Sequence, residues 1–119
     1  MATFSKIKLG NSTNGRGILV AATSSPGTLI HTTSTTATTI DEVWLYAQNS
    51  DTTARKLTIE WGGTGSGDIL ESTIPAESGL YLISAGLILL YSGSTTTINA
   101  FASVTNVIGI YGYVNRIAV

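Results

Sequence analysis

The chain has 119 residues and a net charge of −1, and 11% of its residues are charged, well below the roughly 25% of an average globular domain. The six basic residues are scattered, which excludes the clustered cations of a typical nucleic-acid-binding surface. The absence of cysteine excludes a disulfide framework, a thiolate zinc site and a cysteine nucleophile. We predict one domain over residues 1–119, whose weakly charged surface favours a homo-oligomer or a place in a larger assembly.

The N-terminal residues 1–16 allow two interpretations, a short strand or an extended arm. Two sets of side chains alternate over residues 3–9 and would face opposite ways in a strand: Phe4, Lys6 and Lys8 against Ser5, Ile7 and Leu9. An arm with this alternation could add a strand to the sheet edge of a partner. No apolar segment of a signal peptide occurs here.

The middle of the chain, residues 40–61, has the strongest local pattern. Two alternating segments flank the turn formers of residues 49–53, whose short polar side chains can bond their own backbone. We interpret this stretch as one long antiparallel hairpin that ends at the glycine-rich residues 62–68. The period of two points four apolar side chains into a core: Val43, Leu45, Leu57 and Ile59.

The other segments are short and are separated by turn residues such as Ser24-Ser25-Pro26-Gly27. Four of the six residues 34–39 are threonine, and we predict an exposed connection or an edge strand there. Residues 80–83 are predicted to form a buried strand that breaks at residues 84–86. The predicted strands outside the hairpin are residues 17–22, 28–32, 69–74, 80–83, 87–91, 97–104 and 107–119.

No window supports a helix, and turns recur every eight to twelve residues or so, which is typical of a β-sandwich or barrel. We therefore predict an all-β protein, an antiparallel β-sandwich of about eight to ten strands, with a jelly roll as a candidate topology. The most apolar run, residues 80–91, is shorter than the roughly 20 residues that cross a bilayer. We expect no membrane partner.

The single histidine, His31, could act as a general base or a metal ligand. The simpler interpretation is a strand histidine, at a sheet edge or bonded to a neighbouring threonine. We favour the simpler one because no second histidine exists to build a zinc site. A small hydrolase that uses His31 stays an open alternative.

Other chemical motifs are missing. The loop at residues 62–68 fits neither the nucleophile-elbow, dinucleotide-binding nor P-loop pattern, and no calcium loop occurs. Asp41 and Glu42 are strand neighbours and face opposite sides, whereas Glu60 and Glu71 could converge from separate strands. Solubility and turn capping are the roles that we favour for these acids. We therefore expect no enzyme activity, no catalytic, cofactor-binding or metal site, and no cofactor.

The aromatic residues allow two roles. Trp44 and Tyr46 lie opposite Val43 and Leu45 on their strand, and Tyr111 and Tyr113 are placed in the same way on theirs. Such rows can bind sugars or form an interface, or they can be buried in cross-strand pairs. We favour burial in the core or between subunits. The candidate interface residues are Phe4, Lys6, Lys8, Trp44, Tyr46, Trp61, Tyr111 and Tyr113.

About two thirds of the chain, from Asp41 onward, resembles a small structural protein found among the head genes of tailed bacteriophages. The segments that carry the resemblance are V-W-L-Y-A-x-N, A-R-x-L-T-I-E-W-G-G, T-I-P-A-x-S-G-L and I-Y-G-Y-V-N-R. They are packing and turn motifs, and none of them is catalytic.

The resemblance implies a head decoration (cement) protein of the virion, made in the host cytoplasm, that binds the outside of an icosahedral phage head and stabilises it. The implied partner is the major capsid protein, and the implied assembly is a homotrimer. The alternative is a head-fibre or tail-fibre domain that binds a host-surface glycan. Its candidate contacts are Trp44, Tyr46, Trp61 and the loop at residues 62–67.

Overall fold

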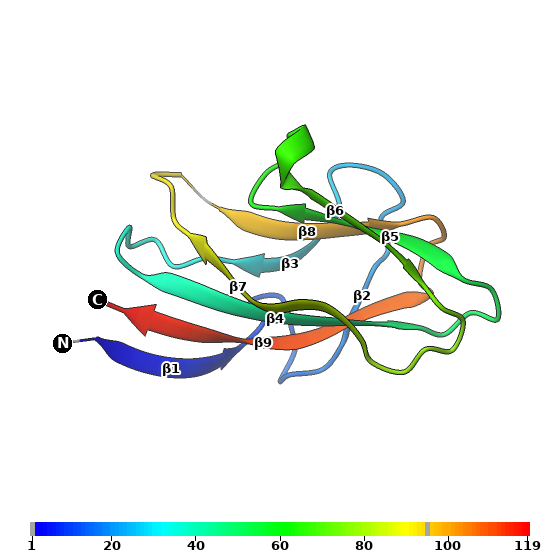
Figure 1. The fold of residues 1–119 in the computed structure, drawn as a ribbon, viewed down its shortest axis with the longest axis horizontal. Helices are drawn as coiled ribbons and strands as arrows, with labels where there is room; N and C mark the ends of the chain where they lie inside the picture. The colour runs from blue at the N-terminus through cyan, green and yellow to red at the C-terminus, as the bar shows by residue number, and fades with distance from the viewer. Residues whose placement is uncertain (1, 95) are drawn as a thin grey trace.

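Two antiparallel sheets pack face to face in the computed structural model, which describes residues 2–94 and 96–119 (Figure 1). Sheet A has the order β1 (Thr3–Lys8), β9 (Ile108–Ala118), β4 (Ile40–Asn49) and β7 (Tyr81–Leu90), and β2 (Ile18–Leu19) also pairs with β9. Sheet B has the order β3 (Thr28–Thr32), β8 (Thr97–Ala102), β5 (Arg55–Trp61) and β6 (Ile69–Ile74). One short 3-10 helix, η1 (Ser66–Asp68), precedes β6.

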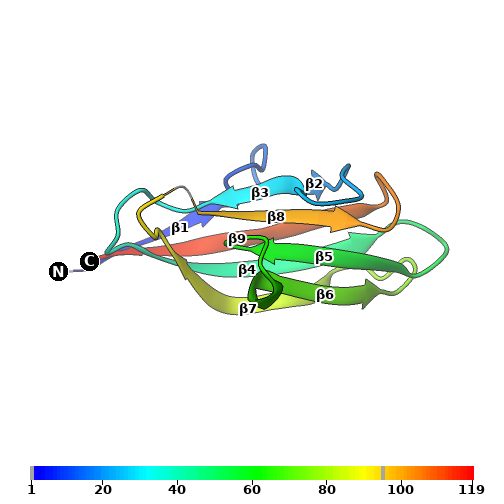
Figure 2. The same cartoon turned by 90° about the horizontal axis from the view of Figure 1, so that it is seen from above.

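The strand order is that of a jelly roll. β1 and β2 pair with successive parts of β9 and together act as one interrupted strand. Counted this way, the chain has eight strands, and each one except β6 lies in the other sheet from the strand before it. This order is that of a jelly roll with its two Greek keys. Figure 2 shows the four strands of sheet B lying over those of sheet A, with β3 above β1 and β6 above β7. The all-β sandwich prediction is confirmed, with jelly-roll topology.

The core lies between the sheets and follows the alternation of the sequence. Along β4, buried and half-buried residues alternate without interruption. The four side chains predicted to face inward are buried, and they belong to both sheets: Val43, Leu45, Leu57 and Ile59. Each buried aliphatic side chain contributes about 1.5–3 kcal/mol to folding.

The predicted hairpin at residues 40–61 is wrong. β4 and β5 are strands, but β4 pairs with β7 and β9, and β5 pairs with β6 and β8. The connection therefore carries the chain from sheet A to sheet B. Periodicity predicts which face of its strand a side chain occupies, but not which strand lies beside it. The inward faces of β4 and β5 oppose each other across the core, and the two strands are not neighbours in one sheet.

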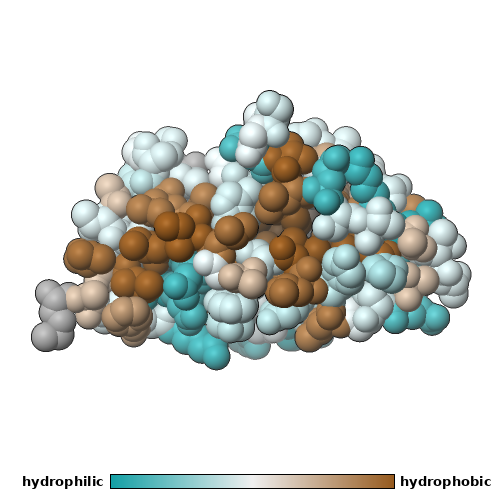
Figure 3. Space-filling model, viewed as in Figure 1, coloured by the Kyte–Doolittle hydropathy of each residue, from teal (hydrophilic) through white to brown (hydrophobic). Residues whose placement is uncertain are grey.

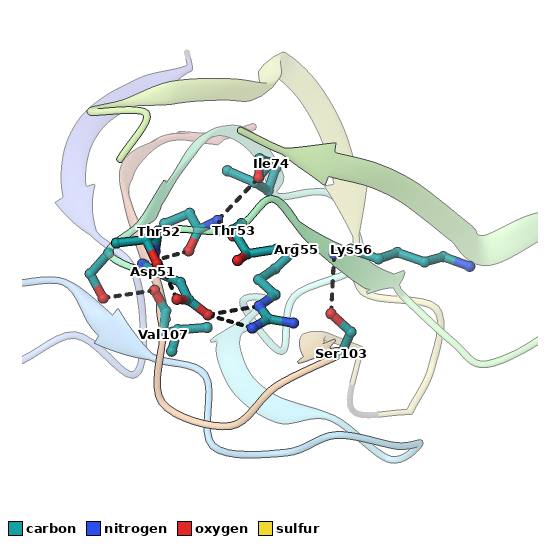
Figure 4. A network of polar contacts seen from close by, with 10 residues as sticks. Asp51, Thr52, Thr53, Arg55, Lys56, Ile74, Ser103 and Val107 are labelled. Atoms are coloured by element: carbon teal, nitrogen blue, oxygen red, sulfur yellow. Dashed lines mark hydrogen bonds and ion pairs between the residues drawn. The ribbon is translucent and has the colours of Figure 1, made fainter. Parts of the chain in front are cut away.

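The connection between β4 and β5 is held by polar side chains (Figure 4). The buried Asn49 amide donates to the carbonyl oxygens of Thr53 and Ile74, at 3.0 and 3.1 Å. Its Oδ1 accepts a hydrogen bond from the backbone of Asp51 at 2.9 Å, as expected for an Asx turn. Arg55 in turn donates to the Asp51 carboxylate at 2.7 Å. The turn residues were predicted correctly, although they join two sheets.

β7 differs from its prediction in two respects. It runs without a break through residues 84–86, because Gly86, at a φ of 80°, is absorbed as an irregularity in the register with β4. Leu80 and Leu82 are also exposed, by 63% and 51%. β7 is the edge strand of sheet A, and no described element covers it. Its apolar residues are therefore partly exposed, although their hydrophobicity predicted burial.

The remaining connections are mostly as expected. Residues 3–8 form the strand alternative, paired with β9, and residues 34–39 are a connection outside the sheets. The predicted strand at 17–22 is reduced to the two residues of β2. The turn at residues 24–27 is anchored by Glu60, which accepts hydrogen bonds from the Ser25 hydroxyl and, at 2.7 Å, from the Gly27 backbone. Glu60 therefore acts as a turn-capping acid.

Candidate interaction surface

The outer face of sheet A carries nearly all of the predicted interface residues. On β4 and β9, the side chains opposite the buried positions share this face, and the register places Trp44 beside Tyr113 and Tyr46 beside Tyr111. On β1, Lys8 is in register with Tyr113. Sheet B covers only the other face. The predicted residues that the structure brings together here are Phe4, Lys6, Lys8, Trp44, Tyr46, Tyr111 and Tyr113.

Three of these side chains form a ladder across three strands. The Lys6 ammonium lies 4.4 Å from the centre of the Tyr113 ring. The Tyr113 and Trp44 rings are stacked, with centroids 5.9 Å apart and planes 9° apart. A cation over an exposed ring contributes about 0.5–1 kcal/mol, and an aromatic pair adds about 0.5–1.5 kcal/mol. The ladder holds the middle of this face rigid.

Trp44 is less accessible than a sugar-binding platform requires. Gly86 of β7 lies so close that an added Cβ would be 3.3 Å from the indole. The indole Nε1 is buried and has no hydrogen-bond partner among the described residues. Trp44 therefore supports the face, and its neighbours supply the accessible surface.

A depression on this face extends over β1, the end of β9 that pairs with β1, and the start of β4. Phe4, which is 72% exposed, lines this depression. Glu42 stands on its rim and accepts a hydrogen bond from the Asn115 amide at 3.3 Å. The depression is lined by Phe4, Ser5, Lys6, Glu42, Asn115 and Ile117. An exposed apolar group with both signs of charge beside it fits the anatomy of a protein contact.

The structure places Trp61 apart from the other interface residues. It ends β5 in sheet B and packs, partly buried, against the core. Trp44 and Tyr46 instead belong to the outer face of sheet A. The three candidate contacts of the glycan alternative are therefore not on one face.

His31 belongs to a buried polar cluster that joins the two sheets. Its Nδ1 accepts a hydrogen bond from the Gly10 backbone N–H at 2.9 Å, so the ring proton resides on Nε2. Nε2 lies 2.8 Å from Oδ2 of Asp41, and Arg116 donates to both oxygens of the same carboxylate, at 2.7 and 2.8 Å. His31 and Asp41 are each 1% exposed. Bidentate, charge-assisted bonds of this kind are among the stronger ones.

The charge on Asp41 is stabilised inside the fold. Burial raises the pKa of the Asp41 carboxyl, but the hydrogen bonds from Arg116 and His31 outweigh burial and hold it below its usual value. The hydrogen bond to Asp41 also raises the pKa of Arg116. The cluster is therefore an ionised carboxylate bonded to a guanidinium and an imidazole.

This geometry assigns His31 a structural role. A general base needs a ring nitrogen with an available lone pair, and here Nδ1 is occupied by Gly10 while Nε2 donates to Asp41. The prediction of a strand histidine at a sheet edge is confirmed, because β3 is an edge strand of sheet B. The partners of the ring are Asp41 and Gly10 instead of a neighbouring threonine. Strand parity could have indicated that Asp41 faces inward with Val43 on β4, although it does not identify the partners of the carboxylate.

The remaining acids have separate partners. Glu60 is bonded to the turn at residues 24–27, whereas Glu71 pairs with Lys56 at 2.8 Å on the exposed surface. Asp41 and Glu42 face opposite sides, as predicted. Within residues 2–94 and 96–119, no group of three His, Cys, Asp or Glu side chains is placed to hold a metal ion.

Comparison with protein-family models, curated proteins and solved structures found no match. In the part of the chain that the structure describes, no helix is long and apolar enough to span a membrane.

Proposed function

We propose that this chain is a non-enzymatic structural protein of the virion, a decoration protein that binds the outside of a phage head and stabilises it. The observation that carries the proposal is the outer face of sheet A, which no described element covers although aromatic and apolar side chains lie on it. The outward face of an antiparallel sheet is usually polar. An uncovered face of this composition indicates a contact with another protein.

The segments that resemble phage head proteins support the proposal by their positions. V-W-L-Y-A-x-N belongs to β4 and I-Y-G-Y-V-N-R to β9, and these two strands carry the aromatic residues of the outer face. Jelly rolls also occur in viral capsid domains. That likeness is an analogy of fold, which many unrelated functions share.

The proposed partner is the major capsid protein, which would contact the depression around Phe4. Phe4 could enter an apolar pocket on the shell, while Lys6 and Glu42 would form polar contacts at the rim. The buried cluster and the core would keep the sandwich rigid, so that one copy can bridge neighbouring capsid subunits.

The test is binding of the purified protein to expanded heads that lack it, measured by co-sedimentation. Phe4→Asp should weaken binding at least tenfold, because a carboxylate would replace the most exposed aromatic side chain of the face. This variant is preferable to removal of the first nine residues, since that deletion would remove β1 from sheet A. The matched control is Leu29→Asp, at an exposed position on β3 of sheet B.

Failure of the wild-type protein to bind heads would overturn the proposal, and so would equal binding by the two variants. Retention of the wild-type protein on a glycan array, lost in Tyr46→Ala, would favour the fibre alternative instead.

A further inference from the structure

The side of the sandwich formed by β6 and β7 has an apolar band, which Figure 3 shows running along the molecule. Its main contributor is β7, the edge strand of sheet A. Ile88 is 55% exposed, about as much as Leu82. The exposed apolar residues of this strip, which we call the β7 strip, are Leu80, Tyr81, Leu82, Leu87, Ile88 and Leu90.

The β7 strip belongs to a stretch of sequence without charged residues. No Asp, Glu, Lys, Arg or His occurs from Ser78 to Asn115, a range that includes all of β7 and β8. Natural edge strands usually carry charges, especially lysine, that discourage pairing with another chain. Two β7 strands could therefore pair without a like-charge contact between the strands themselves. On the neighbouring strand, Glu42 is in register with Ile88 and is bonded to Asn115.

The sequence of the strip is nearly palindromic about Ala85. Reading outward from Ala85, small residues come first, as Ser84 and Gly86, and large apolar residues follow on both sides in L-Y-L-I and L-I-L-L. A two-fold contact joins the same patch on both subunits and must be complementary to itself. A palindromic strand fulfils this condition when it pairs antiparallel with its own copy.

We propose that two copies of this chain associate through the β7 strip, antiparallel, about a two-fold axis at Ala85. This register places Leu82 of one copy opposite Ile88 of the other, and Leu80 opposite Leu90. The small residues at the centre let the two strands approach closely. Each copy then covers the exposed leucine and isoleucine side chains of its partner.

The contact is closed and does not propagate. A two-fold contact uses the same strip on both copies, so the pair leaves no free β7 edge for a further copy. Register shifts on β7, between Leu87 and Ala85 and between Ser84 and Leu82, interrupt its backbone hydrogen bonding. Side-chain packing therefore contributes more than backbone hydrogen bonds. The product is a dimer, not the trimer that the resemblance implies.

The axis of such a pairing is perpendicular to sheet A, so both copies would direct the outer face of sheet A to the same side. If the proposed function is correct, one dimer would bind the shell through the outer faces of both of its copies of sheet A. The dimer itself does not depend on that function, because it can be measured with the purified protein alone.

The first test is the solution mass by light scattering behind a sizing column, across a range of concentrations. The expected mass is twice that of the 12.4 kDa chain. Leu82→Lys and Ile88→Lys should each weaken the dimer at least tenfold, whereas Leu19→Lys, at a similarly exposed position on β2 (54%), should leave it unchanged. Circular dichroism checks that each variant is folded.

The second test uses the absence of cysteine from the chain. Residues directly opposite on antiparallel strands have Cβ atoms about 4.5–5.5 Å apart, close to disulfide distance. Ala85→Cys should therefore give a covalent dimer under mild oxidation, and Leu19→Cys should not. A wild-type monomer or trimer at all concentrations, a dimer that survives both lysine variants, or equal cross-linking of the two cysteine variants would overturn the proposal.

Discussion

The two long sides of the sandwich differ in the kind of side chains that they carry. On the side of β1 and β3, His31, Asp41 and Arg116 form a buried polar cluster that also binds the backbone of Gly10. On the side of β6 and β7, apolar side chains reach the surface. Buried polar groups are costly unless each one finds its partner. On the first side these partners all come from strands and loops of the same chain. The second side has no such requirement and can associate with another molecule.

The largest expected effect is on the polar side. Asp41→Ala leaves the Arg116 guanidinium and the buried His31 ring without their shared acceptor, and loss of one partner of a buried ion pair costs about 3–5 kcal/mol. We expect a fall of that size in the free energy of unfolding, measured by urea denaturation. The control is the next residue on the same strand, Glu42→Ala, which faces outward and should change stability by less than about 0.5 kcal/mol. Equal effects at the two positions would contradict the assigned role of the cluster.

The polar side should also respond to acid. The pKa of Asp41 is lower in the fold than in the unfolded chain, so the stability that its charge contributes is complete above the unfolded value of about 3.9 and is lost as pH falls through the folded value. The difference in unfolding free energy between wild type and Asp41→Ala should therefore shrink below about pH 4. Urea titrations of both proteins at a series of pH values measure it, and a difference that grows on acidification would contradict the linkage.

The smallest effect is expected on the apolar side. Leu82→Ala removes a side chain that is half exposed in the single chain, so under conditions where the chain is monomeric the loss should stay below about 1 kcal/mol. The same substitution in the core, Leu45→Ala, should cost about 2–5 kcal/mol because it leaves a cavity. Thermal unfolding of the two variants at low protein concentration gives the comparison. A loss at Leu82 as large as that at Leu45 would show that β7 packs more tightly than its exposure indicates.

The sequence was sufficient for most of the strands and for the faces of the side chains on β4, β5 and β9, because strand alternation is a local property. Val43 and Leu45 could be assigned to the core, and Tyr111 and Tyr113 to the opposite face of their strand, from neighbouring residues alone. The partners of each strand depend on topology, which a period of two does not encode. For that reason the turn at Asn49 was interpreted as a hairpin.

The candidate surface could be predicted only in part for a similar reason. Trp44 and Tyr46 were assigned to one face correctly, whereas the position of Trp61 depends on which sheet contains β5. The bond between His31 and Asp41 joins strands of different sheets, and the exposure of Leu82 depends on β7 being an edge. Neither follows from the residues adjacent in sequence.

β9 is the last strand of the fold to be synthesised, yet it lies in the middle of sheet A and pairs with β1, β2 and β4. Ile108 follows Asn49 by 59 residues (108 − 49), which a ribosome adds in about 3–12 s at roughly 5–20 residues per second. During that interval β9, the strand that lies between β1 and β4, is missing. The apolar side chains of β4 can then contact other nascent chains. Sheet A can be completed only after synthesis of β9, so this protein is expected to fold late and to need protection from aggregation until then.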